Sequence, residues 1–168
     1  MTETAKLTAS DGVPGDALGL SVDLNGATIV AGAGGASVQS MEQQGAAYVF
    51  AEPPGGWADA TQTAKLTASD GQAFAHFGTS VTVNGKNIVV GAPEAVVGST
   101  DYEGAAYVFQ EPVTGWRSSS RFSSKETPSD GQYDEGFGWF DALRAGSLAV
   151  GAPFPDNSSV GIVYVFAE

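Results

Sequence analysis

The side chains that could do chemistry in this 168-residue chain are few, and most of them are carboxylates. Cysteine is absent and His76 is the only histidine, so thiolate nucleophiles, zinc–thiolate centres and His-rich metal sites are excluded by residue type. His76 lies beside Phe77 at the expected start of a strand, where a loop or packing role explains it more simply than catalysis. The sequence therefore predicts no catalytic residue and a protein that is not an enzyme.

The acidic residues suggest two further kinds of site, each with a simpler structural alternative. Asp11 with Asp16 could bind a metal ion, and so could a second group, Asp130 with Asp134 and Glu135. Asp11 and Asp130, however, stand in Ser-Asp-Gly segments, which are typical of turns in which the Asp side chain bonds the backbone two residues on. A carboxylate pair could hydrolyse a glycosidic bond, but nineteen acidic residues bring some pairs within about 5–10 Å by chance.

The charge balance excludes two classes of partner. The formal net charge is −12, with only seven Lys and Arg residues. Binding to nucleic acids or to anionic lipid surfaces draws on clusters of basic side chains, which this chain lacks. No apolar run approaches the roughly 20 residues of a membrane-spanning helix. We therefore expect neither nucleic-acid binding nor membrane insertion.

The elements that must position these side chains repeat along the chain. The segment AKLTASDG occurs at residues 5–12 and again at 64–71, and a diverged copy, KETPSDG, lies at 125–131. GAAYVF at 45–50 likewise returns at 104–109 and, as GIVYVF, at 161–166. A period of about 60 residues indicates a supersecondary unit that buries its apolar faces against copies of itself.

Each repeat reads as four short strands, and no segment favours a helix. Gly and Pro are frequent, and the apolar segments are short, rich in Val, Ala, Tyr and Phe, and bounded by turn residues. Asn25-Gly26 and Asn84-Gly85 predict two-residue type I′ hairpins between the first and second strands. The predicted strands are 18–24, 28–33, 45–51 and 61–67; then 77–83, 87–92, 104–110 and 121–125; then 137–143, 147–152 and 161–167.

The strand starts and ends carry a family signature. Phe77-Gly78 is followed by Gly91-Ala92-Pro93, and Phe137-Gly138 by Gly151-Ala152-Pro153; the first repeat departs from this as Leu18-Gly19 and Gly32-Ala33-Gly34. These ordered pairs resemble the FG-GAP repeat family, the unit of the integrin α-subunit propeller and of many bacterial surface proteins. The resemblance implies a β-propeller, usually seven-bladed, whose loops bind proteins or carbohydrates, often with calcium. It also implies an extracellular or cell-surface location.

Calcium-binding members carry an Asp-x-Asp-x-Asp-Gly loop between the first two strands, and here that loop has shrunk. Only Asp23 with Asn25, Asn84 or Asp141 remain at the corresponding places. Because Ca²⁺ takes six to eight oxygen ligands, we expect no calcium and no other cofactor.

The blade order predicts self-association. The predicted blades cover roughly 10–67, 70–125 and 130–168, and a surplus fourth strand, 5–9, precedes them. Propellers have typically four to eight blades, so three are too few to close a ring, whereas two chains supply six. We therefore expect a head-to-tail homodimer in which residues 5–9 complete the partner's third blade. The alternative is a piece of a longer propeller.

The loops after the second strands are the predicted binding surface. Residues 34–44, 94–103 and 154–160 differ between repeats while their flanking strands match, as expected of a fixed scaffold with separately used loops. The candidate ligand-binding residues on this face are Glu94, Asp101, Tyr102, Tyr133, Asp134, Asp156 and Asn157. Trp57 and Trp116 could stack on sugars, so an oligomeric lectin is the second hypothesis, and a purely structural or hydrolytic propeller is the third. The favoured function is a non-catalytic binding or adhesion module that recognises a protein or glycan.

Overall fold

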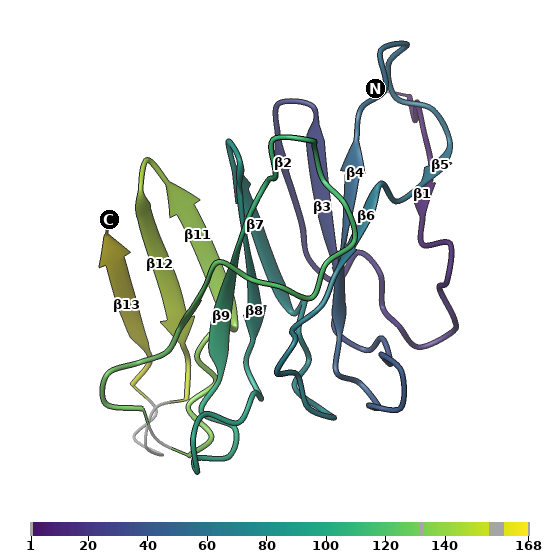
Figure 1. Ribbon diagram of the computed structural model, residues 1–168. Helices are drawn as coiled ribbons and strands as arrows, with labels where there is room; N and C mark the ends of the chain where they lie inside the picture. The colour runs from purple at the N-terminus through teal and green to yellow at the C-terminus, as the bar shows by residue number, and fades with distance from the viewer. Residues whose placement is uncertain (1, 132, 155–159, 168) are drawn as a thin grey trace.

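The chain folds entirely into strands, turns and loops. The computed structural model describes residues 2–131, 133–154 and 160–167, and within these ranges it contains thirteen β-strands and no helix (Figure 1). The prediction of an all-β fold built from antiparallel sheets is therefore confirmed.

Three antiparallel sheets stand side by side, one for each sequence repeat (Figure 1). The first has the order β2 (Val22–Asn25), β3 (Thr28–Ala33), β4 (Ala46–Ala51) and β6 (Ala64–Leu66). The second has the order β7 (Ser80–Asn84), β8 (Asn87–Ala92), β9 (Ala105–Gln110) and β10 (Ser124–Glu126). The third contains β11 (Phe140–Arg144), β12 (Ser147–Ala152) and β13 (Ile162–Ala167). Among the described residues the third sheet thus has the three strands that were predicted for it, without a fourth.

The first strand of each sheet begins three or four residues later than predicted, because the glycine of the Leu-Gly or Phe-Gly pair is not extended. Gly78 has φ +99° and Gly138 has φ +92°, a conformation that L side chains rarely adopt. Gly78 instead donates its N–H to the Gly91 carbonyl, which fixes the entry into β7. The polar strand predicted at 121–125 is also displaced, and β10 begins at Ser124.

The hairpin turns between the first two strands differ from the prediction in the first two sheets. Asn25 pairs with Thr28, so the two turn residues are Gly26 and Ala27 rather than Asn25 and Gly26. Only Gly26 has a positive φ, which is the pattern of a type II′ turn. The third sheet does carry two positive φ angles, at Ala145 and Gly146, as a type I′ turn requires.

The core lies between the sheets, and the Phe-Gly and Gly-Ala-Pro motifs build it. Phe77 is fully buried and packs edge-on against Tyr107 and Phe109. A Cβ at Gly91 would collide with the carbonyl oxygen of Gly138 in the next sheet. The motif residues therefore allow the backbones of neighbouring sheets to approach closely, which is why they recur with the repeat.

The N-terminal segment forms an unpredicted contact. β1 (Leu7–Thr8) pairs in parallel with β5 (Ala60–Thr61), at the end of the array opposite β13 (Figure 1). The second repeat contains the same arrangement as a parallel bridge between Leu66 and Ser119. The segment therefore occupies the place of a fourth strand that belongs to a preceding sheet.

Candidate binding surfaces

The loop before β9 and the loop before β11 meet at the lower end of the sheets in Figure 1, and together they bring an aromatic pair to the surface. The rings of Tyr102 and Tyr133 meet edge to face with centroids 5.9 Å apart, and 38% and 62% of these residues remain exposed. The Asp134 N–H donates to the Asp101 carbonyl oxygen over 3.4 Å, which ties the two loops together. Four of the residues predicted from sequence thus form one patch, the Tyr102–Tyr133 patch, with carboxylates beside it.

The backbone that carries this patch is a property of the repeat. Tyr102 and Asp134 have left-handed φ angles of 57° and 61°. Gln43 and Phe74, at the corresponding places one repeat earlier, have φ angles of 49° and 63°. Because the conformation is shared, it indicates a common scaffold and not strain specific to one site. What distinguishes the patch is the side chains that the scaffold displays.

Glu94 lies in a groove at the ends of the sheets where β2, β7 and β11 begin. The groove has a volume of about 450 Å³, and its lining includes Leu20, Trp139 and Phe140. Glu94 Oε2 is 3.6 Å from His76 Nε2, and His76 Nδ1 is 3.1 Å from the Gly34 carbonyl oxygen. When Nδ1 donates to the Gly34 carbonyl, His76 forms an ion pair with Glu94 only as the imidazolium, in which Nε2 also carries a proton. His76 thus has a partner that sequence reasoning did not anticipate.

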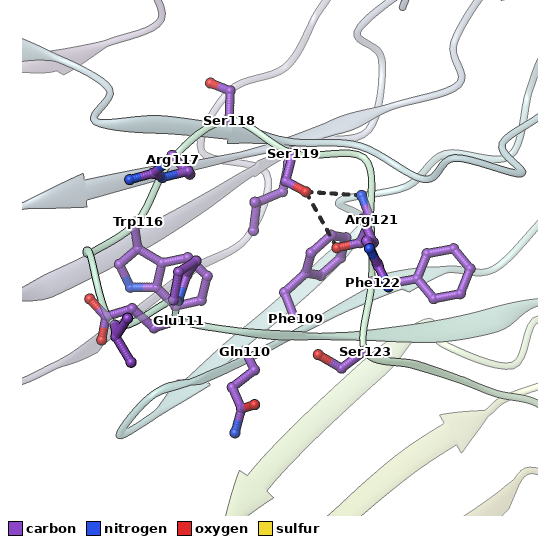
Figure 2. A pocket seen from close by; sticks show the side chains of 13 residues that line it. Phe109, Gln110, Glu111, Trp116, Arg117, Ser118, Ser119, Arg121, Phe122 and Ser123 are labelled. Atoms are coloured by element: carbon purple, nitrogen blue, oxygen red, sulfur yellow. Dashed lines mark hydrogen bonds between the residues drawn. The ribbon is translucent and has the colours of Figure 1, made fainter.

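The two tryptophans are more enclosed than their flanking turns suggested. Trp116 is only 8% exposed, and its indole nitrogen has no hydrogen-bond partner among the described residues. Figure 2 shows the groove beside it, with a volume of about 580 Å³, lined also by Phe109, Phe122 and Arg121. Trp57 is half-buried against the cluster that contains Tyr48. Both residues contribute to the core, and Trp116 also borders an open groove.

The remaining predicted residues, Asp156 and Asn157, lie outside the residues that the structure describes.

A lysine, a tyrosine and an aspartate form a cluster that sequence reasoning missed. Lys65 Nζ is 2.6 Å from Asp11 Oδ2 and 5.3 Å from the centroid of the Tyr48 ring. The Tyr48 hydroxyl donates to the other oxygen of Asp11 over 3.1 Å. The hydrogen bond from Lys65 holds the pKa of Asp11 below its usual range. The signal was present in the sequence, because all three residues belong to the repeated segments.

The second sheet repeats this cluster. Lys125 Nζ is 2.8 Å from Asp70 Oδ2 and 5.1 Å from the centroid of the Tyr107 ring. The Ser-Asp-Gly aspartates therefore bind a lysine of the following sheet, a role that the turn interpretation did not include.

The acidic groups considered for metal binding are used within the protein. Asp16 accepts the backbone N–H of Val13, and Asp130 and Glu135 both lie within hydrogen-bond distance of the Tyr164 hydroxyl. Across the described ranges, no three His, Cys, Asp or Glu residues are grouped so that they could hold a metal ion. In the same ranges, no helix is present that could cross a bilayer.

Burial changes the pKa of one carboxyl group on β11, that of Asp141. Both of its oxygens are shielded from solvent and have no hydrogen-bond partner in the described part of the chain. Burial raises the pKa of Asp141 to about 8. Asp141 and Asp23 line one groove, which also includes Val81, Leu143 and Val165. Asp23 instead accepts hydrogen bonds from the Thr82 hydroxyl and the Val83 N–H.

Comparison with solved structures gives distant similarities. The chain is similar to two computationally designed proteins of known crystal structure, Ika8 and Ika4, at 12% identity each. The match to Ika8 has a TM-score of 0.49 and covers 87% of this chain and 32% of that chain, so the chain spans about a third of the Ika8 length. The match to Ika4 has a TM-score of 0.46 and covers 99% of this chain and 98% of that chain.

A family match covers the first two repeats. No curated protein matches the chain. The family model described as "FG-GAP repeat" matches residues 1–50 and 60–109, which is more than half of the sequence. Those residues include Phe77 and Gly78, whose packing and hydrogen bonding explain the motif physically. The chain belongs to the FG-GAP repeat family.

Proposed function

We propose that this chain is a non-catalytic, propeller-type recognition or adhesion module that binds a protein or glycan through the Tyr102–Tyr133 patch. The observation that carries the proposal is the exposed pair of rings on two neighbouring loops, with Asp101 and Asp134 beside it. Tyrosine provides a large, rigid contact area at low cost in side-chain entropy, and it is enriched in binding interfaces. The adjacent carboxylates favour a ligand that carries basic groups.

Binding to an array of glycans and to a library of immobilised basic peptides tests this function. The double substitution Tyr102→Ala, Tyr133→Ala should weaken binding to any ligand found by at least about tenfold, since buried aromatic anchors dominate interfaces. Gln43→Ala is the matched control, because Gln43 occupies the place of Tyr102 in the preceding repeat with the same sign of φ. Ligand binding that survives the double substitution would contradict the assignment to this patch.

A carbohydrate-binding function at the Trp116 groove is the second candidate. Trp116, two phenylalanine rings and Arg121 border a groove of about 580 Å³, a composition suited to sugar faces and hydroxyls (Figure 2). The double substitution Arg121→Ala, Ser123→Ala leaves the buried Trp116 in place. If it abolishes glycan binding while the tyrosine variant binds normally, the lectin function is favoured.

The groove lined by Asp23 and Asp141 does not favour a hydrolytic function. Glycoside hydrolysis needs two carboxyl groups that reach the substrate. Asp141 is enclosed, and Asp23 is hydrogen-bonded to β7. A binding role for the whole array therefore remains the better proposal.

We further infer that two copies of this chain close a six-bladed ring. The outer sheets expose apolar faces at the two ends of the array: Val22 and Leu24 on one, and Val163 and Val165 on the other, are 57–69% exposed. Val81 and Val83, the counterparts of Val22 and Leu24 in the central sheet, are 6% and 4% exposed because a neighbouring sheet covers them. Exposed faces of this kind mark interaction surfaces, and here each end matches the interface already formed inside the chain. By analogy with its family, we place the protein at the cell surface or outside the cell.

A further inference from the structure

The lysine–tyrosine–aspartate cluster is incomplete in the third sheet. Tyr164 occupies the place of Tyr48 and Tyr107, and Asp130 that of Asp11 and Asp70; the Tyr164 hydroxyl is 3.0 Å from Asp130 Oδ1. The same hydroxyl is 2.6 Å from Glu135 Oε1. A phenol has one proton to donate, so the two carboxylates compete for it. No lysine contacts Asp130 or Tyr164 among the described residues.

The missing lysine would come from a fourth strand. In the first sheet Lys65 lies on β6 directly opposite Tyr48 on β4, and in the second Lys125 lies on β10 directly opposite Tyr107 on β9. In the described part of the third sheet, β13 pairs only with β12. The free edge of β13 and the vacant lysine position are therefore two signs of one absent strand.

The chain contains a segment with the required sequence. Residues 5–12 are identical to residues 64–71, so Lys6 corresponds to Lys65. The first of these segments is less covered, since Ala5, Leu7 and Ala9 are half-buried whereas their counterparts Ala64, Leu66 and Ala68 are buried. Lys6 itself is exposed, and its ammonium group forms no ion pair within the described ranges.

One edge of this segment is already docked as in the second repeat. The Lys6 N–H donates to Asp59 Oδ1, and Leu7 pairs with Ala60. The matching contacts of the other copy are the Lys65 N–H to Ser118 Oγ and the bridge between Leu66 and Ser119. The opposite edge of this segment corresponds to the edge of β6 that pairs with β4, and in β1 it remains open.

We propose that Lys6 of a second copy completes the lysine–tyrosine–aspartate cluster of the third sheet. This inference rests on the two-copy ring proposed above. The segment 5–9 of one copy adds antiparallel to β13 of the other, with Lys6 opposite Tyr164. Its ammonium group then binds Asp130 and lies over the Tyr164 ring, as Lys65 and Lys125 do in their own sheets. β1 and β13 of one copy lie at opposite ends of the array, so Lys6 reaches Asp130 from a second copy and not from its own (Figure 1).

Disulfide trapping tests the register directly, because the chain has no cysteine of its own. The pairing of Ala64 with Val49 predicts that Ala5 faces Val165 across the interface. The double variant Ala5→Cys, Val165→Cys should form a covalent dimer on mild oxidation. The control Ala5→Cys, Val163→Cys has the same chemistry two residues out of register, and it should remain mostly uncrosslinked.

A double-mutant cycle by analytical ultracentrifugation tests the lysine. Lys6→Met should raise the dimer Kd by about tenfold or more, since both interfaces of the ring lose a charge-assisted contact and a cation–π contact. Asp130→Asn should weaken the dimer as well, and it should weaken it less when Lys6 is already Met. Lys86→Met, which removes an exposed lysine in the turn after β7, is the control with the same change in net charge.

The outcomes separate the two proposals. A wild-type chain that is monomeric at tens of micromolar overturns both the ring and the assignment of Lys6. A dimer that crosslinks at Ala5 and Val165 but has the same Kd with Lys6→Met as with Lys86→Met leaves the ring standing and overturns the role of Lys6. A dimer that does not crosslink in this register uses another surface and overturns both.

Discussion

Asp141 is the residue whose chemistry most disagrees with its surroundings. Asp141 occupies the position on the first strand of its sheet that Val22 and Val81 occupy in the other two sheets. A valine there needs no hydrogen bond, whereas the enclosed carboxyl group has no partner among the described residues. We therefore expect this residue to lower stability at neutral pH.

The first prediction concerns the pH dependence that Asp141 imposes. Its folded-state pKa of about 8 lies above the value near 3.8 of an exposed Asp, so the folded state binds the proton more tightly. Its contribution to the free energy of unfolding is most favourable below pH 4 and falls by up to about 1.4 kcal/mol per pH unit as pH rises towards 8. Asp141→Asn and Asp141→Val should flatten this slope in urea titrations at several pH values. A slope between pH 4 and 8 that both variants retain would assign it to other groups.

A second prediction tests the close approach of neighbouring sheets. Gly104 has φ +91°, and a Cβ there would collide with the Phe137 backbone of the next sheet. Gly104→Ala should cost about 2–4 kcal/mol in the free energy of unfolding, from the combined strain and overlap. Gly55→Ala, at a glycine with no atom near its missing Cβ, should change it by less than about 1 kcal/mol. Equal effects of the two substitutions in chemical denaturation would contradict the packing explanation.

At the scale of elements, β1 and β13 are the two strands whose surroundings are incomplete. The three strands β4, β9 and β13 are near-copies in sequence, yet most of β4 and β9 is buried and much of β13 is exposed. The difference arises from neighbours, since β4 and β9 each pair on both edges and β13 pairs on one.

The third prediction follows from these open edges. Deleting residues 1–10 removes β1 and uncovers the cluster of Tyr48 and Phe50, against which Leu7 and Ala9 pack. Unpaired strand edges and exposed apolar surface promote aggregation. The truncated protein should be polydisperse or insoluble in light scattering. Removing residues 1–4 alone, which precede β1, should leave the light scattering unchanged. If both truncations made the protein equally polydisperse, the effect would belong to the terminus and not to β1.

At the scale of the molecule, the fourth prediction is the solution mass. The chain should sediment at close to twice 17.1 kDa, because the exposed apolar end of one copy matches the opposite exposed end of another. A compact species of 17.1 kDa at tens of micromolar would contradict the ring.

The fifth prediction concerns metal. The acidic side chains that might have held calcium bind lysine, tyrosine or backbone groups instead. A ligand that does not bind the folded state adds nothing to its stability, so a chelator should leave the melting temperature within about one degree of its starting value. A drop of several degrees in a thermal scan, reversed by added Ca²⁺, would reveal a site in this family member.

Much of the fold follows from the sequence, because it depends on local patterns that repeat. Short apolar runs separated by turn residues fix strands, and three copies of one pattern fix three similar sheets. The turn at Gly26 and Ala27 was misplaced by one residue, since the Asn-Gly signal does not determine which residues pair across the hairpin. The start of β7 was misplaced because the positive φ of Gly78 depends on its bond to Gly91, a contact across the sheet.

The candidate binding surfaces could likewise be predicted only in part from the sequence. Variation between repeats pointed to the loop that holds Tyr102, because matching strands make differences between loops visible. Tyr133 was included because its loop follows a Ser-Asp-Gly segment expected on the same face. The sequence could not reveal that the two rings meet, nor that Lys65 reaches Asp11 across 54 residues, because such contacts depend on how sheets stack. The sequence by itself thus determined the strands, the repeat and the family. The tertiary structure decided which side chains share a site, because only packing between sheets brings distant segments together and leaves Asp130 and Tyr164 without the lysine that their counterparts have.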